Sequence, residues 1–291
     1  MNRTRCRAVA AAAAAMSLTF AARAAPEGSL QATSPLGRKL YALPDDDAVA
    51  AARAKLKADP KNPALVLALS LAHASRRQYR EAVAACTAGL ADNPKSADLY
   101  IERGHRELGL SEFASAQRDL EKGAELAPRQ GGAFYHLGLA HYFQGHFDRA
   151  AEALRDALAR AQDDDSVIDA THWLYVSLRR AGREKEAAGA LQRITPAVKN
   201  TEPHLLFYLK LLRFYQGSLA EKDVLPPRPA DPADTEAELA FATQTYAVGN
   251  FRLYTRAPRD PASLFREVVQ GNVWNAWGFI GAETELARRP H

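Results

Sequence analysis

The chain has 291 residues, with 38 Lys or Arg against 34 Asp or Glu. The basic excess lies in the first 24 residues. Without their four arginines the counts are 34 and 34, so the rest of the chain gives no reason to expect nucleic acid or an anionic membrane surface as a partner. Of two cysteines only Cys86 lies beyond that segment, which excludes an intramolecular disulfide there. The remaining 267 residues are enough for a long solenoid or two packed helical parts.

The first 24 residues have the pattern of a secretory signal peptide. Three arginines precede position 8, an apolar run extends from Ala8 to Phe20, and Ala22-Arg23-Ala24 is a cleavage signal of the A-x-A kind. A membrane-spanning helix is the alternative, but the run is shorter than the roughly 20 residues that a span needs. Cys6 stands among arginines and lacks the small apolar residues that precede a lipidated cysteine. We therefore expect export to the periplasm, with cleavage before Ala25 and no lipid anchor.

Residues 25–44 contain three prolines and no helical period, so they predict an extended lead-in. Three aspartates, Asp45-Asp46-Asp47, then precede an alanine-rich helix. We interpret them as groups that cap the free N–H groups of that helix rather than as metal ligands. The stretch Asp47–Pro60 matches Glu81–Pro94 at a shift of 34 residues. It predicts the second helix of a repeat whose first helix is missing.

The main feature of the chain is an alanine that returns every 34 residues, followed twelve residues later by a proline in the first three cases. The alanines are Ala48, Ala82, Ala116 and Ala150, and the prolines are Pro60, Pro94 and Pro128. A 34-residue period of this kind is the signature of a tetratricopeptide repeat (TPR) array. Three full repeats occupy about 63–96, 97–130 and 131–164, and a fourth, at a spacing of 37, occupies about 168–195. The array spans 45–196, and the predicted fold is an all-α superhelical solenoid of helix-turn-helix repeats.

Residues 197–291 carry helical patterns without the period. An apolar, aromatic helix is expected over 203–216, with Gly217 at its C-terminal end. A proline-rich linker follows near 225–233. We expect this C-terminal part to close the solenoid as degenerate helical repeats and an end cap.

Three more helices are predicted after the linker. Thr235 and Glu238 form a capping-box pattern for the first of them, which should run to Gly249. The last two are separated by a Gly-Asn pair, and Trp274 and Trp277 are expected on the apolar face of the final helix.

The stretches Tyr100–Arg106 and Phe134–Tyr142 resemble exported bacterial TPR proteins. The C-terminal block, with Tyr246–Phe251 and Trp274–Arg288, is similar to the end segment of the same group and, more distantly, to the NlpI-like periplasmic adaptors. The resemblance implies an all-helical solenoid that acts as an adaptor and brings envelope enzymes or assembly factors together.

In TPR proteins four positions of each first helix usually face the concave groove, and this family pattern implies a set of candidate binding residues. They are Ile101, His105, Leu108, Tyr135, Leu139, Tyr142, His172 and Arg179. Tyrosine, histidine and arginine in a concave surface can anchor a peptide, because they combine apolar area with a hydrogen-bonding tip. The alternative is that Tyr135 and Tyr142 only pack between neighbouring repeats.

The other chemically active residues of the array do not form a recognisable site. His136 and His141 are five residues apart, which does not place them on one helix face. His105 and His172 are separated by a whole repeat, so we expect no metal site. Cys86 holds a repeat position that leucine fills in later repeats, and we interpret it as a small buried hydrophobe. No motif of a nucleophile elbow, zinc protease, P-loop, dinucleotide site or C-x-x-C pair is present, so no cofactor is expected.

The sequence therefore predicts an exported, non-enzymatic adaptor of the bacterial envelope that binds a protein or peptide. Two alternatives stay open. In the first, the C-terminal helices pair two copies into a structural homo-oligomer and the groove is incidental. In the second, the chain is an enzyme that acts on cell-wall material, with a site between the repeats and the C-terminal part.

Overall fold

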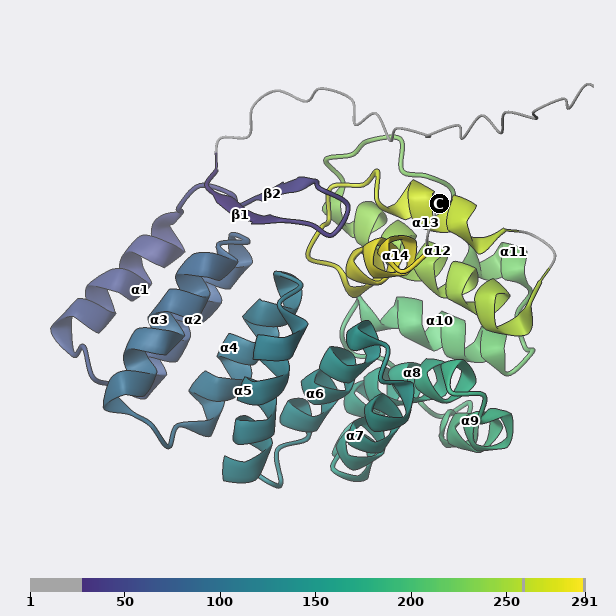
Figure 1. Cartoon of the computed structure of the whole chain (residues 1–291), viewed down its shortest axis with the longest axis horizontal. Helices are drawn as coiled ribbons and strands as arrows, with labels where there is room; N and C mark the ends of the chain where they lie inside the picture. The colour runs from purple at the N-terminus through teal and green to yellow at the C-terminus, as the bar shows by residue number, and fades with distance from the viewer. Residues whose placement is uncertain (1–27, 258–259, 290–291) are drawn as a thin grey trace, which may run out of the picture.

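A computed structural model describes residues 28–257 and 260–289 (Figure 1). The predicted signal segment, residues 1–24, lies outside the described residues. Within the described ranges, no helix is both long and apolar enough to cross a bilayer. The expectation of export therefore rests on the sequence pattern alone.

The first part of the chain is a row of antiparallel helices that follows the 34-residue period (Figure 1). Their bounds are α1 Asp47–Ala58, α2 Pro63–Ser75, α3 Tyr79–Asp92, α4 Ala97–Gly109, α5 Phe113–Leu126, α6 Gly131–Gln144, α7 Phe147–Ala159, α8 Asp164–Arg180 and α9 Glu184–Ala190. Each helix packs against the next. Helix α1 stands without a first helix before it, as the predicted half repeat requires, and α2, α4, α6 and α8 are the first helices of the repeats.

Polar side chains cap the N-termini of several of these helices, at boundaries that the sequence predicts. The Asp46 side chain accepts a hydrogen bond from the backbone N–H of Val49, which confirms the capping interpretation for this aspartate. Asn62 caps α2 in the same way, with proline at the first helical position. Asp163 caps α8 through the N–H of Ser166. Asp163, Asp164 and Asp165, which fall where the spacing of the repeats widens from 34 to 37 residues, therefore start a 17-residue helix.

Small residues let the two helices of a repeat approach closely. A Cβ atom added at Gly104 would lie 2.7 Å from Leu120 Cγ, and one added at Gly138 would lie 2.5 Å from Leu154 Cγ. Both distances are shorter than ordinary carbon contacts, so the glycines are required by the packing of α4 on α5 and of α6 on α7. Ala150 faces the same interface and is fully buried.

Replacing Ala150 by leucine is expected to overpack this interface and lower the free energy of unfolding by about 1–3 kcal/mol. Ala159, an exposed residue at the end of the same helix, provides the matched control. Ala159→Leu should change stability by less than about 0.5 kcal/mol. Urea denaturation followed by circular dichroism measures both. Equal stability of Ala150→Leu and the parent would refute the repeat register.

The C-terminal part is helical and packs back onto the row. Its elements are the 3₁₀ turn η1 Leu191–Arg193, α10 Leu205–Tyr215, α11 Glu221–Val224, α12 Thr235–Thr255, α13 Pro261–Val268 and α14 Trp277–Ala287. Helix α10 packs against α8, and α12 contacts α8, α10, α13 and α14. In Figure 1 these helices lie across the side of α6 and α8. The C-terminal part thus covers the first helices of the array.

Two of the predicted boundaries in this part are wrong. Helix α12 is capped by Asp234, whose side chain accepts from the N–H of Ala237, and not by the Thr235–Glu238 pair. Glu238 is buried and accepts instead from the N–H of Asn272, at 3.3 Å. The helix also continues past Gly249 to Thr255, because Phe265 of α13 packs directly on that glycine, where an added Cβ would lie 2.6 Å from Phe265 Cε1.

The extended lead-in forms an antiparallel hairpin of β1 Leu30–Thr33 and β2 Lys39–Tyr41. It links the two parts of the molecule. The N–H of Arg80 in α3 donates to the Gln31 side chain at 2.7 Å. The side chain of Arg38 donates to the carbonyl of Val269 at 2.6 Å, and the Trp274 indole donates to the carbonyl of Tyr41 at 3.0 Å. Trp274 therefore lies in the turn before α14, not on that helix as expected, because it anchors the hairpin.

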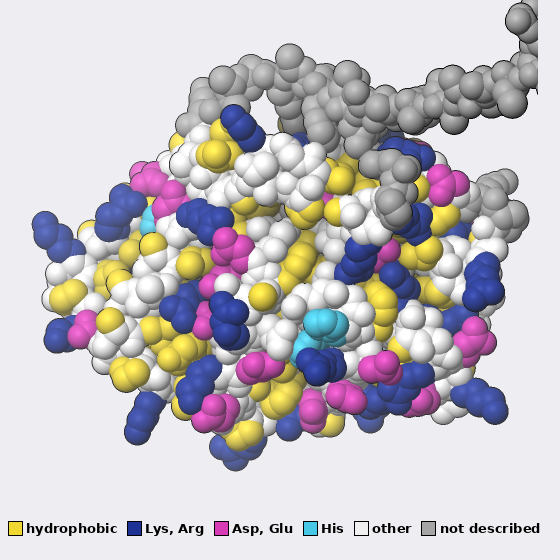
Figure 2. All heavy atoms as spheres, in the orientation of Figure 1, with side chains coloured by type: hydrophobic (Ala, Val, Ile, Leu, Met, Phe, Trp, Pro, Cys, Tyr) yellow, Lys and Arg dark blue, Asp and Glu magenta, His cyan; other side chains and the backbone are white. Residues whose placement is uncertain are grey.

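Most of the apolar core is one continuous cluster that runs from the hairpin through the array to α14. A smaller cluster between α2, α3 and α4 contains Cys86, which is fully buried. Burial raises the pKa of its thiol to about 11, so the interpretation of Cys86 as a buried hydrophobe is confirmed. On the face seen in Figure 2, basic and acidic side chains intermix as on an ordinary solvated surface.

Candidate functional site

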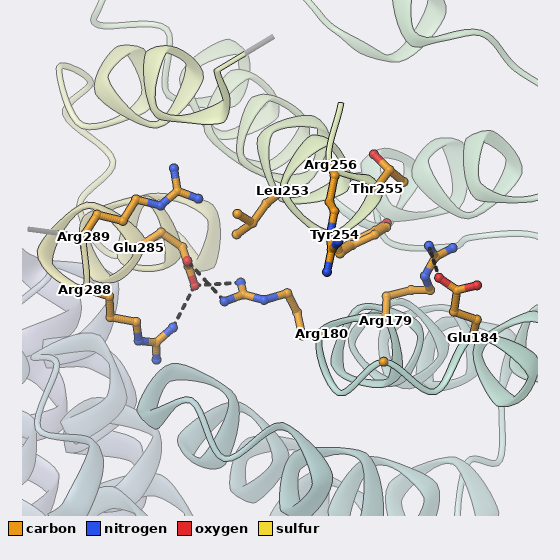
Figure 3. Close-up of a pocket in the computed structure, with 11 residues that line it drawn as sticks. Arg179, Arg180, Glu184, Leu253, Tyr254, Thr255, Arg256, Glu285, Arg288 and Arg289 are labelled. Carbon is orange, nitrogen blue, oxygen red and sulfur yellow. Dashed lines mark hydrogen bonds and ion pairs between the residues drawn. The ribbon is translucent and has the colours of Figure 1, made fainter. Parts of the chain in front are cut away.

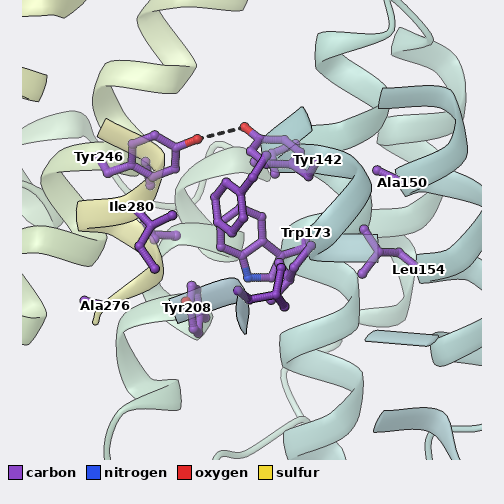
Figure 4. Close-up of a cluster of buried hydrophobic side chains, with 14 of the residues drawn as sticks. Tyr142, Ala150, Leu154, Trp173, Tyr208, Tyr246, Ala276 and Ile280 are labelled. Carbon is purple, nitrogen blue, oxygen red and sulfur yellow. Dashed lines mark hydrogen bonds between the residues drawn. The ribbon is translucent and has the colours of Figure 1, made fainter. Parts of the chain in front are cut away.

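The face formed by the first helices of the array, which we call the inner face, is packed against the chain's own C-terminal part. Tyr142 of α6 is central to this contact (Figure 4). Its hydroxyl lies 3.0 Å from the Tyr246 hydroxyl of α12 and accepts from the Asn250 side chain at 2.7 Å. Trp173 of α8 lies against the same tyrosine, with ring centroids 5.1 Å apart. These side chains join the array to α12 by a buried polar and aromatic contact.

This packing separates the eight predicted groove residues. Leu108, Leu139 and Tyr142 are buried in the core, and His172 packs between Tyr208 and Tyr215 of α10, with ring centroids 4.5 and 5.8 Å away.

The other four predicted groove residues lie in three places. Ile101 is buried against Gly123 of α5, and Arg179 lies near the end of α8 at the opposite end of the inner face. His105 and Tyr135 remain together at one cavity. Ligand binding by any of the eight stays a prediction, and His105 and Tyr135 are the two of them that this cavity brings together.

That cavity, which we call the interhelical pocket, has a volume of about 380 Å³. It lies between the inner face and the C-terminal part, because α4, α6 and α8 supply one side and α10, α12 and the start of α14 supply the other. The side chains that matter for its chemistry are those of His105, Tyr135, His136, Asp169, Tyr208 and Trp277. A volume of this size is typical of a site for a small ligand or for one or two peptide side chains.

One wall of the pocket is aromatic and uncharged at neutral pH. The rings of His105 and His136 are stacked with centroids 4.1 Å apart, and Trp277 lies 5.5 Å from His105. Burial lowers the pKa of His105 well below its ordinary value and lowers that of His136 to about 4. Neutral imidazoles can stack on an aromatic or aliphatic group and still exchange hydrogen bonds with it.

Sequence reasoning missed His136 as a pocket residue. A signal was present: His136 follows His105 by 31 residues, one helical turn short of the 34-residue period. Residues at that offset lie on facing turns of neighbouring first helices, because one turn of an α-helix holds 3.6 residues.

A polar pair lies beside these rings, because the Tyr135 ring packs edge-on against His136 with centroids 5.1 Å apart. The Tyr135 hydroxyl donates to the Asp169 carboxylate at 3.3 Å. Burial raises the pKa of Asp169 to about 7, and the hydrogen bond from Tyr135 acts in the opposite direction. A second cavity of about 360 Å³ lies on the other side of this pair, between the starts of α6 and α8 and the end of α7. Tyr135 and Asp169 line both cavities, so the two cavities adjoin at this pair.

Replacing Asp169 by asparagine is expected to stabilise the protein more at high pH than at low pH. The folded carboxyl holds its proton more tightly than the unfolded one, so its contribution to stability falls as the pH rises from about 4 to about 7. The Tm of Asp169→Asn relative to the parent should therefore be higher at about pH 8 than at about pH 5. Asp92→Asn, a change at an exposed residue, should show no such difference. A pH-independent effect of Asp169→Asn would contradict the burial of this carboxyl.

The described residues contain no group of three or more His, Cys, Asp or Glu side chains placed to hold a metal ion.

Comparison with known proteins concerns the fold. No protein-family profile matches the chain, and no curated protein matches its sequence significantly. Many solved structures match its fold, including those of several TPR proteins. The fold is an all-α TPR solenoid.

Three of these structures indicate the range of the similarity. YrrB, described as a TPR protein with an unusual peptide-binding site, is 16% identical over 72% of this chain and 98% of its own, with a TM-score of 0.46. A TPR protein from Parabacteroides merdae is 17% identical over 83% of this chain and 91% of its own, with a TM-score of 0.49. The Cut9–Hcn1 hetero-tetramer of APC/C reaches a TM-score of 0.51 at 16% identity, over 75% of this chain and 42% of the matched chain.

Proposed function

We propose that this TPR solenoid is a non-enzymatic scaffold that binds a protein or peptide partner in the bacterial envelope. The observation that carries the proposal is the pair of cavities of about 380 and 360 Å³ that meet at Tyr135 and Asp169. A peptide has side chains at regular spacing, and two adjoining cavities offer places for two of them. The partner class, envelope enzymes or assembly factors, comes from the resemblance to exported TPR proteins.

The chemistry of the interhelical pocket favours a peptide segment with an apolar or aromatic side chain. The His105–His136–Trp277 wall is uncharged at neutral pH and offers ring faces for stacking. Tyr135 and Asp169 lie beside these rings and can take hydrogen bonds from the N–H groups of a peptide backbone. Such an arrangement would place one side chain against the rings and the backbone beside the polar pair.

The packing of the C-terminal helices bears on the alternative of a homo-oligomer. Nearly all of α14 is buried within one chain, from Gly278 to Leu286. Gly278 lies so close to α12 that an added Cβ would come within 2.3 Å of the Ala242 carbonyl oxygen. The apolar faces of these helices are thus already used inside the protomer, and pairing two copies would need another surface.

Affinity capture from native envelope extracts, with matched variants, tests the proposal. Tyr135→Ala removes the wall between the two cavities, whereas Tyr100→Ala removes a half-buried tyrosine of α4 outside both of them. Partners enriched by the parent should be retained by Tyr100→Ala and depleted by about tenfold or more by Tyr135→Ala, at unchanged helicity. Equal capture by all three proteins would place the contact elsewhere, and recovery of only the protein itself would favour the homo-oligomer.

The envelope location has its own readout in the same preparation. N-terminal sequencing of the protein from the periplasmic fraction should give a chain that starts at Ala25. An uncleaved chain confined to the cytosol would refute export without affecting the peptide-binding proposal.

A further inference from the structure

A third cavity, unrelated to the interhelical pocket, lies where α8, α12 and α14 end (Figure 3). Its volume is about 800 Å³, and it is open to solvent on one side. Five arginines line it, namely Arg179, Arg180, Arg256, Arg288 and Arg289. Among the described lining residues the carboxylates are Glu184 and Glu285, so the formal charge of the lining is +3. We call this the arginine cavity.

Two of the arginines are engaged in the structure of the protein itself. Arg180 and Arg288 both pair with Glu285, at 2.8 and 2.7 Å. Arg288 also donates to the backbone carbonyl of Phe143 at the end of α6. In Figure 3 this group lies together at one side of the cavity. These contacts hold α14 against the array.

The other three arginines are less fully paired. Arg179 has one ion pair, at 3.3 Å, with the largely exposed Glu184, and its buried Nε has no hydrogen-bond partner among the described atoms. No ion pair joins Arg256 or Arg289 to a carboxylate within the described ranges. Arg256 is exposed at the end of α12, and Arg289 lies over the Phe265 ring. These guanidinium groups are available to a ligand at the open side of the cavity.

The ends of the helices do not account for all of this charge. Each helix C-terminus carries a partial negative charge of about half an elementary charge, which arginines commonly offset. Three such ends amount to about −1.5, and the N-terminus of α9 at the lining residue Glu184 adds about +0.5, against a lining of +3. The cavity therefore keeps a positive potential that favours an anionic ligand.

The same helix ends favour a ligand with several separate carboxylates over a ligand with a single phosphate group. Phosphate is typically held by backbone N–H groups at a helix N-terminus. The ends of α8, α12 and α14 present carbonyl groups to this cavity instead, and α9, which begins at the lining residue Glu184, is a helix of only seven residues. Negative charge must then be held by separate side chains. Guanidinium groups bind carboxylates in a bidentate manner, which suits this arrangement. Leu253 and Tyr254 supply an apolar wall beside the arginines, with Arg179 4.7 Å above the Tyr254 ring.

We propose that the arginine cavity binds an acidic peptide segment with at least two carboxylates. Arg256 and Arg289 hold one carboxylate each, Arg179 reinforces them, and Leu253 and Tyr254 contact the peptide backbone and aliphatic carbons. The site lies apart from Tyr135 and Asp169, so it is independent of the function proposed for the two cavities there.

A direct binding measurement tests the proposal with the full-length mature protein and a fluorescent hexaglutamate peptide. Fluorescence anisotropy at low salt gives the Kd. The double variant Arg256→Ala, Arg289→Ala should raise the Kd by about tenfold or more, since each lost bidentate contact removes a charge-assisted pair. Arg118→Ala, Arg149→Ala carries the same change of net charge on exposed residues of α5 and α7 and should raise it by less than about twofold.

Further arms separate the outcomes. Arg256→Gln alone, an exposed change that should leave the fold intact, is expected to weaken binding by about threefold. Tyr135→Ala should leave the Kd unchanged even if it abolishes the capture of partners. The proposal is refuted if the parent does not bind hexaglutamate, or if both double variants lose affinity equally. It is also refuted if pyrophosphate displaces the peptide at concentrations below the peptide's own Kd, because the cavity would then be a phosphate site.

Discussion

Replacing Trp173 by alanine is expected to lower the free energy of unfolding by about 3–5 kcal/mol, the usual cost of removing a large buried aromatic side chain. Trp173 is fully buried in α8. Its ring lies 5.1 Å from Tyr142 in the array, and 6.5 Å from both Tyr208 of α10 and Tyr246 of α12. The substitution therefore leaves a cavity at the point where three parts of the molecule meet (Figure 4).

The measurement is urea denaturation followed by far-ultraviolet circular dichroism. Trp173→Phe keeps one ring and should cost less than half as much as Trp173→Ala. Leu71→Ala changes an exposed side chain of α2 and should stay within about 0.5 kcal/mol of the parent. Limited proteolysis should also cleave the linker near residues 225–233 faster in Trp173→Ala, since α10 and α12 lose a shared contact with α8. Stability equal to that of Leu71→Ala would show that this ring does not join the parts.

Glu285→Ala is expected to destabilise the protein by a similar amount, about 3–5 kcal/mol, because it leaves a buried charge without its partner. The side chains of Glu285 and Arg180 are 4% and 13% exposed. Without the carboxylate, Arg180 keeps its hydrogen bond to Asn250 and its contact with the Phe147 ring but has lost its counter-charge, and Arg288 loses the same partner. The loss of this ion pair should therefore weaken the contact of α14 with the array.

A surface pair nearby provides the control. Glu184 is 72% exposed and pairs with Arg179, so Glu184→Ala should cost less than about 1 kcal/mol. Replacing both partners with apolar residues, as in Arg180→Met, Glu285→Leu, should recover at least half of the loss caused by Glu285→Ala, because no unpaired charge remains at that position. A cost of Glu285→Ala no larger than that of Glu184→Ala would contradict the burial of this pair.

The repeat array could be predicted in detail because its determinants are local and recur. A first helix packs on its second helix through positions that return every 34 residues, so Gly104 and Gly138 hold equivalent places. The burial of Cys86 follows from the same alignment and is confirmed. The half repeat at α1, predicted from the same alignment, stays a prediction. The C-terminal part lacks the 34-residue repeat, so its helix ends can be predicted only from local residue patterns. Local signals therefore predict helix ends at Thr235 and Gly249, although Asp234 caps α12 and Phe265 packs on the glycine.

The candidate site, too, could be predicted only in part from the sequence. The family pattern pointed to His105 and Tyr135, which do face a cavity, and equally to Tyr142, which does not. The periodic sequence thus specified the helices, their pairing and the face that the first helices share, since these depend on contacts between neighbours in the chain. It did not specify what covers that face. Which segment covers the inner face depends on contacts such as that between Tyr142 and Tyr246, which are 104 residues apart. Such contacts depend on complementary shape and hydrogen bonding, and they do not recur at a fixed spacing in the sequence.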